Sequence, residues 1–200
     1  ATSHLSPAIA LLQEQTGADE ASNHEHILAL QGQRGKALMA RRGYAAKETR
    51  LAFEQAMEIV GKIKDTPLHF PVLYGLWVAQ HVGGDHADAL LRGEALVAQT
   101  RHAADSGASL VANRALAISL MMQGRFDQAQ SYFEQAHALY DSKAHAALAD
   151  SYGHEPGVGN YMYGALNLWA LGKTQQAEAC ARKGEQMALA TGHINTICYM

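Results

Sequence analysis

The stretch WVAQHVGGDHADA (Trp77–Ala89) carries the pattern that decides the fold: an apolar run ends at a glycine, and an alanine follows five residues later. The same pattern recurs in AISLMMQGRFDQA (Ala117–Ala129) and in ALNLWALGKTQQA (Ala165–Ala177). The three turn glycines stand 40 and then 48 residues apart, and the three alanines keep both intervals. Self-similarity at such spacing indicates a chain built of repeated helical hairpins.

The glycine and the alanine each meet a steric requirement of a tight helical hairpin. A helix that ends and reverses needs a residue that adopts a positive φ, and glycine does so at little cost. The second helix must approach the first closely, so a small side chain is favoured where they cross. Because one hairpin cannot bury its apolar face, neighbouring units stack. We therefore predict an all-α, right-handed solenoid of antiparallel helix pairs, a tetratricopeptide-like superhelix of about four units.

The unit boundaries follow from the spacing and from turn signals. Asp65-Thr66-Pro67 and Asp105-Ser106-Gly107 separate adjacent units. The prediction is a lead-in helix within residues 1–22, followed by repeats over 23–200 with units at about 23–64, 67–106, 107–141 and 158–191. The last segment, His193–Met200, resembles the opening turns of another helix, which predicts that the chain is a piece of a longer protein.

Composition and charge argue against several classes of partner. The formal net charge of −3 predicts no binding of nucleic acid and no attraction to an anionic membrane surface. No apolar run approaches the roughly 20 residues that a membrane-spanning helix needs. Two cysteines, Cys180 and Cys198, are too few for a disulfide framework. We therefore expect free thiols and a cytoplasmic protein.

Candidate chemical sites are few, and each has a structural alternative. The glycine-rich run Gly153–Gly159 could bind an anion through exposed backbone N–H groups, but it lacks the Lys-Ser/Thr of a phosphate loop. The alternative interpretation is an ordered loop between two repeats. The histidines of His24-Glu25-His26 point apart on a helix, and His81 with Asp85-His86 would need a further metal ligand. We predict no catalytic residue, no cofactor and no bound metal.

A binding surface is the stronger prediction. In stacked hairpins the first helix of each unit lines the concave side, and its non-core positions face the groove. Such a surface suits an extended peptide or an amphipathic helix, unless a helix of the same chain, such as the segment Ser6–Gln15, fills it. Counting back from the turn glycines, the equivalent positions are Tyr74, Val78, His81, Arg114, Ile118, Met121, Met162, Leu166 and Trp169.

Three segments resemble a known family: RGYAAKET (Arg42–Thr49), DTPLHFPVLYGLWV (Asp65–Val78) and LYDSKAHAALADSYGHEPGVGNYMYGALNLWALGKTQQA (Leu139–Ala177). They are similar to the tetratricopeptide-like C-terminal region of bacterial signalling proteins that carry a class III adenylate/guanylate cyclase and an AAA-type predicted ATPase. The run Tyr152–Val158 is the most specific part, although Glu155 stands where Asp is more frequent. The resemblance covers roughly residues 24–200 and implies a regulatory or scaffolding segment, with no catalytic residue to transfer.

Two function classes follow. The first is a non-catalytic interaction module whose partner is a protein, a peptide or another domain of the same parent chain; a homo-oligomer is compatible with it. The second is a sensor that binds a small effector in the groove or at the Gly153–Gly159 loop. Heat stabilisation by small ligands would favour the sensor, and capture of an apolar peptide would favour the interaction module.

Overall fold

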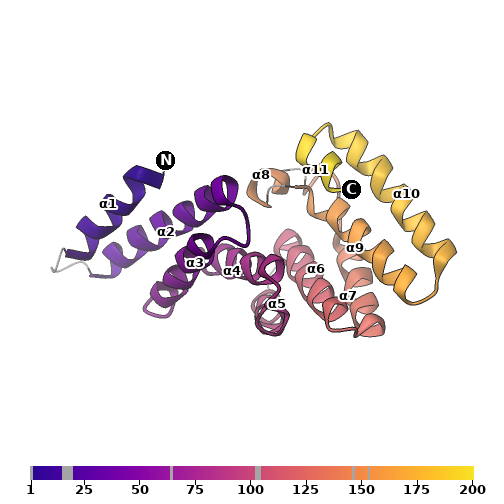
Figure 1. Cartoon of the computed structure of the whole chain (residues 1–200), viewed down its shortest axis with the longest axis horizontal. Helices are drawn as coiled ribbons and strands as arrows, with labels where there is room; N and C mark the ends of the chain where they lie inside the picture. The colour runs from indigo at the N-terminus through magenta and orange to yellow at the C-terminus, as the bar shows by residue number, and fades with distance from the viewer. Residues whose placement is uncertain (1, 15–19, 64, 102–104, 146, 153) are drawn as a thin grey trace. The chain divides into compact units, whose positions relative to one another are not determined.

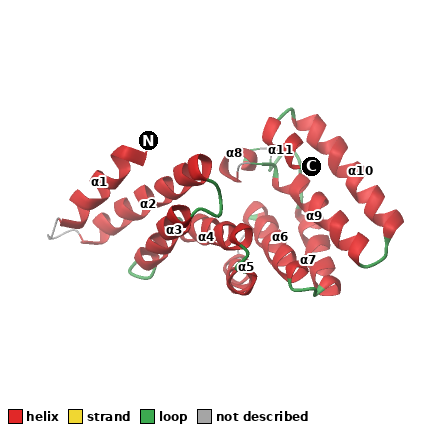
Figure 2. Ribbon diagram, viewed as in Figure 1, coloured by secondary structure: helices red, strands yellow, loops and turns green. Residues whose placement is uncertain are grey.

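The computed structural model describes residues 2–14, 20–63, 65–101, 105–145, 147–152 and 154–200, and these ranges hold helices and connecting loops without a strand (Figure 2). The chain forms two compact parts, Ala1–Arg92 and Gly93–Met200. The helices, labelled in Figure 1, are α1 (Thr2–Glu14), α2 (Glu20–Arg42), α3 (Lys47–Val60), α4 (His69–Gly83), α5 (His86–Thr100), α6 (Ser106–Met122), α7 (Phe126–Leu139), α8 (Leu148–Tyr152), α9 (Pro156–Ala170), α10 (Thr174–Thr191) and α11 (Ile194–Tyr199).

The core of the N-terminal part forms around one aromatic ring on α3. Phe53 is buried, and it is surrounded by apolar residues of α1, α2 and α4 such as Ile9, Leu28 and Val72. Gly35 of α2 and Gly75 of α4 face this ring so closely that a Cβ atom on either would overlap it. Glycine weakens a helix interior, so its presence at these two positions is explained by the space that Phe53 needs.

The C-terminal part is built of two helical hairpins. Helix α6 packs on α7, α9 packs on α10, and α9 also contacts α7 (Figure 1). Gly124 and Gly172 close the two hairpins with φ values of 72° and 74°, and Gly84 has a φ of 85° at the end of α4. The predicted left-handed turn glycines are thereby confirmed, and so is the burial of the small residues beyond them, Ala89, Ala129 and Ala177.

Two buried asparagines fix α9 along α7. The Asn160 side-chain amide donates to the Phe133 carbonyl at 3.0 Å, and the Asn167 amide donates to the Phe126 carbonyl at 3.1 Å. Asn160 and Asn167 are seven residues apart, two helical turns, so both lie on the face of α9 that meets α7. Because unpaired polar groups are costly inside a protein, these bonds select one register between the two helices.

Three further findings bear on the sequence-based expectations. A short helix covers Ile194–Tyr199. Cys180 and Cys198 are free thiols. Across the part of the chain that the structure describes, no helix combines the length and the apolar character that crossing a membrane requires.

Candidate partner-binding surface

The structure separates the nine predicted groove positions into covered and open ones. Only two are exposed, Leu166 by 51% and Trp169 by 68%. His81 and Met162 are half-buried. The remaining five are buried: Tyr74, Val78, Arg114, Ile118 and Met121.

The expectation that these five side chains face an open groove is therefore wrong. Counting from a turn glycine gives the position of a residue on its own helix, but it does not say what covers that face. Helix α6 is buried without interruption from Leu110 to Met121, and α4 from Val72 to Gln80. Tyr74 lies against Trp77, with ring centroids 5.4 Å apart, and Arg114 is covered by residues near the C-terminus.

The two exposed positions and the half-buried Met162 form a strip along α9. Met162, Leu166 and Trp169 follow the spacing i, i+4, i+7, which places them on one side of a helix. The opposite side of α9 carries Asn160 and Asn167, which bond to α7. Helix α9 contains no charged residue over its 15 positions. The result is an uncharged apolar strip that ends at an exposed tryptophan.

A buried polar cluster lies beside the start of α9. The Arg114 guanidinium donates from Nη1 to His154 Nε2 at 2.7 Å, although 40 residues separate the two. Since arginine has no acceptor, His154 must be neutral with its proton on Nδ1. Burial and the neighbouring Arg114 cation lower the pKa of His154 to about 2. Tyr199 of α11 stacks on the His154 ring with centroids 4.3 Å apart, and burial raises the pKa of its phenol.

The predicted glycine-rich run continues into the first turn of α9, which contains Gly157 and Gly159, and packing accounts for these two glycines. A Cβ atom on Gly157 would overlap the Tyr140 ring, and one on Gly159 would lie 2.6 Å from Arg114 Nη1. Glu155 caps α9 by accepting from the Val158 N–H at 2.7 Å. Gly153, which belongs to the candidate phosphate loop, lies outside the described residues. Of the described residues of this run, His154 and Glu155 precede the helix, and Pro156–Gly159 form the packed first turn of α9 rather than a loop.

One set of residues has the composition of a hydrolase triad but not its chemistry. Ser106 Oγ lies 3.0 Å from His145 Nε2, and Asp141 is four residues before His145 in the sequence. The contact of Asp141 with His145 Nδ1, however, is made by its backbone N–H, which donates at 3.2 Å. His145 must then carry its proton on Nε2 and donate to Ser106, so it cannot act as a base toward that hydroxyl. The bonds tie the α7–α8 loop to the start of α6.

The histidines also have structural partners. His81 stacks on Trp77 with centroids 5.2 Å apart, and the His86 ring lies 6.1 Å from His81. Asp85, the third member of that predicted cluster, contacts Arg50. Within the ranges that the structure describes, no group of three or more His, Cys, Asp or Glu residues could hold a metal ion.

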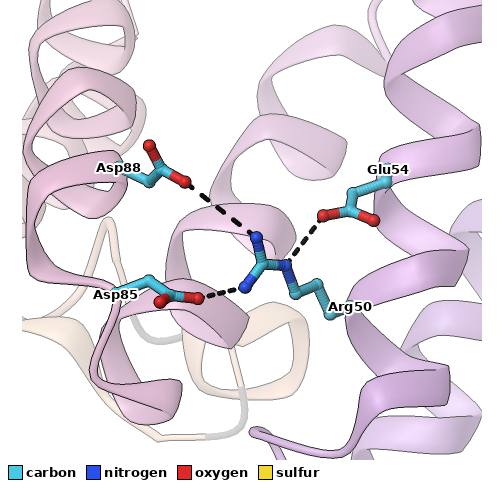
Figure 3. Close-up of polar contacts among 4 residues, drawn as sticks. All are labelled: Arg50, Glu54, Asp85 and Asp88. Carbon is cyan, nitrogen blue, oxygen red and sulfur yellow. Dashed lines mark hydrogen bonds and ion pairs between the residues drawn. The ribbon is translucent and has the colours of Figure 1, made fainter.

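A charge cluster in the N-terminal part joins two helices (Figure 3). Arg50 of α3 pairs with Glu54 one turn along at 2.7 Å, with Asp85 at the start of α5, and with Asp88 of α5 at 3.9 Å. All four side chains are more than one third exposed. Bonds to Glu54 and the nearby carboxylates raise the pKa of Arg50. The cluster holds α3 against the first turn of α5, and its exposure makes it a modest contributor to stability.

Comparison with known proteins gives the fold. No protein-family model matches this sequence, and no curated protein matches it. Two similar solved structures are crystal structures of a Podosopora anserina putative kinesin light chain with nearly identical TPR-like repeats. One of them, a form with a single substitution, aligns with a TM-score of 0.70 and 20% identity over 96% of this chain and 86% of that chain. The other aligns with a TM-score of 0.66 and 18% identity over 95% and 86%. The chain therefore has an all-α fold of TPR-like repeats.

Proposed function

We propose that this chain is a non-catalytic interaction module that binds a protein segment on the apolar strip of α9. The observation that carries the proposal is the exposure of Trp169 and Leu166, one turn apart on a helix without charge. The TPR-like fold supports it, because stacked hairpins present helix faces rather than a convergent polar pocket.

The strip has the chemistry of a binding hot spot. Tryptophan is enriched among the few interface residues that contribute most of the binding free energy, because it buries a large rigid surface. Leu166 and Met162 extend the apolar area along the same side of α9. Removing these side chains from water on binding is favourable, and no charge on α9 must be desolvated at the same time.

The partner that fits best is an amphipathic helix. Met162 and Trp169 are seven residues apart, so the strip is roughly 10 Å long, about two helical turns. This length matches apolar side chains spaced i, i+3/i+4, i+7 on a second helix. Because α9 lacks charge, the contacting face of the partner is expected to be uncharged as well.

Site-specific photo-crosslinking tests this proposal. A photoreactive phenylalanine derivative replaces Trp169 in one variant and Leu189 in another; Leu189 lies on α10 and is 62% exposed, so it is a matched control. We expect one protein to be crosslinked from position 169 and not from position 189. Equal capture from both positions, or none from 169, would count against the α9 strip as the binding surface.

The resemblance of Leu139–Ala177 supports a finer proposal about the setting. We infer a cytoplasmic scaffold or regulatory segment of a larger bacterial signalling protein with a nucleotide cyclase and an ATPase domain, and the bound segment is then a helix of that parent or of its partner. Sequencing the reading frame on both sides of the gene segment tests this setting: cyclase and ATPase motifs in frame would support it, and their absence would contradict it. Sensing of a small effector stays an alternative, for which the tightly packed first turn of α9 around Gly157 gives no support.

A further inference from the structure

The α9 strip, formed by Met162, Leu166 and Trp169, is complementary to itself. Its apolar side chains follow the spacing i, i+4, i+7, and α9 carries no charged residue. These are the two properties that the strip requires of a partner helix. Leu166 and Trp169 are 51% and 68% exposed, so a second molecule can reach them. The strip of a second copy of this chain therefore offers a matching surface.

The spacing of the strip suits an antiparallel crossing of two α9 helices. Leu166 is four residues after Met162 and three residues before Trp169, so it lies near the middle of the strip. About a twofold axis at this point, Leu166 meets its own counterpart, and Trp169 of each copy meets Met162 of the other. A methionine sulfur beside an aromatic ring is a favourable contact. All three side chains are thereby removed from water in both copies.

The charges around the strip favour the antiparallel arrangement over a parallel one. Lys173 is exposed, and it stays beside the C-terminal end of the strip because its N–H bonds to the Leu168 carbonyl at 2.9 Å. At the other end of α9, Glu155 is buried. In an antiparallel pair the two Lys173 residues are separated by roughly 20 Å along the helices, which is beyond the roughly 8 Å range of exposed charges at physiological salt. In a parallel pair they would lie side by side and repel each other.

We propose that a second copy of this chain occupies the α9 strip, with the two α9 helices antiparallel about a twofold axis near Leu166. This inference rests on the proposed function and names the partner of that same surface. A strip of about two helical turns gives a small interface, and small interfaces form weak, reversible complexes. The chain is therefore expected to be a monomer when dilute and a dimer when concentrated.

Sedimentation equilibrium of the purified full chain tests whether a second copy binds. The weight-average mass should rise from the 21.5 kDa of one chain toward twice that value as the concentration increases to about 1 mM. Leu166→Lys places two like charges near the twofold axis and should weaken self-association at least about 10-fold. Leu189→Lys, at a position on α10 that is 62% exposed, is the matched control and should leave self-association unchanged. A mass of 21.5 kDa at every concentration, or equal effects of the two variants, would overturn the proposal.

Disulfide trapping tests the antiparallel arrangement. In a chain that carries Cys198→Ser, which removes the exposed thiol, Leu166→Cys should give a covalent dimer on mild oxidation because the two copies of position 166 meet. Ala170→Cys is the matched comparison, since Ala170 is exposed and lies one turn further along the same side of α9. In the antiparallel pair the two copies of position 170 are roughly 12 Å apart along the helices, which is too far for a disulfide. Equal linkage from both positions would contradict the antiparallel arrangement.

The two kinds of experiment separate this inference from the proposed function. If the purified chain stays monomeric and a different protein is crosslinked from position 169, the strip binds that protein rather than a second copy, and the proposed function stands. If the chain dimerises and position 169 crosslinks it to itself, both are supported. A monomeric chain that crosslinks no protein from position 169 would contradict both.

Discussion

Arg114 and His154, which are 40 residues apart in the sequence, form a buried hydrogen bond of 2.7 Å beneath the C-terminal helix. The bond joins α6 to the loop before α9, and it requires a neutral imidazole because the guanidinium only donates. Arg114 is one of the positions that the sequence analysis expected to face a partner. The chain itself covers Arg114, whereas the strip on α9 is left open.

The neutral state of His154 predicts a loss of stability in acid. Its pKa is about 2 in the folded chain against a usual value of 6.5, so below pH 6.5 the unfolded chain binds a proton that the folded chain does not. Stability is therefore complete above pH 6.5 and falls as the pH drops from 6.5 toward 2. Between pH 7 and pH 5 we expect the free energy of unfolding to decrease by about 2 kcal/mol through this group, measured by denaturant titration.

A variant isolates the contribution of this histidine. His154→Gln retains an acceptor for Arg114 but does not titrate, so its free energy of unfolding should depend less steeply on pH over the same interval. His137, whose pKa is also lowered by burial, remains in both proteins and contributes equally to them. The same pH dependence in the variant and the wild type would show that folding does not lower the pKa of His154.

The close packing of Gly157 in the first turn of α9 predicts an effect on stability. Gly157→Ala places a methyl group into the Tyr140 ring and should lower the free energy of unfolding by about 1–3 kcal/mol. Gly83→Ala is the control, since nothing lies within 4 Å of a Cβ atom at that position, and it should be neutral or slightly stabilising. Thermal and denaturant unfolding of both variants measures the difference, and equal stabilities would refute the close approach of Tyr140.

The turn glycine Gly124 predicts an effect of backbone conformation alone. Its φ is 72°, yet a Cβ atom at this position would meet nothing within 4 Å, so any cost of substitution comes from the positive φ. Gly124→Val should lower the free energy of unfolding by roughly 1 kcal/mol or more, whereas Gly124→Asn should cost less because asparagine tolerates this conformation. The valine variant should have the lower melting temperature of the two. Equal melting temperatures would contradict the explanation by the positive φ.

The Arg50 cluster predicts a salt-dependent contribution. Arg50→Gln removes three carboxylate contacts across α3 and α5 and should destabilise by roughly 0.5 kcal/mol, less at high salt, because all the groups are partly exposed. Arg182→Gln breaks one exposed pair with Glu178 and should cause no measurable change. Denaturant titrations at low and high salt measure the free energy of unfolding of both variants. If the destabilisation by Arg50→Gln is the same at both salt concentrations, it does not have an electrostatic origin.

The hairpins could be predicted from the sequence because their requirements are local. A positive φ demands glycine at Gly124 and Gly172, and a close crossing demands a small residue at Ala129 and Ala177. The open surface could not be predicted in the same way. The exposure of a side chain depends on what packs over its helix. Nothing in the sequence around Arg114 indicates that His154 and Tyr199 cover this side chain.

The register between hairpins could not be predicted either. Asn160 and Asn167 are ordinary polar residues in the sequence, and only their spacing of seven residues on an otherwise uncharged helix could have suggested a shared buried face. The bond between Ser106 and His145 spans 39 residues and has no local pattern that indicates it. Such long-range polar contacts require the tertiary structure.

The most direct test of the central claim is the dissociation constant of the partner captured from position 169, measured with purified proteins. Trp169→Ser should weaken binding by at least about 10-fold, as expected for an interface tryptophan, with an unchanged melting temperature because the side chain is 68% exposed. Leu189→Ser should leave the dissociation constant as it is in the wild type. Equal affinities of the wild type and both variants would contradict the account of α9 as the binding surface.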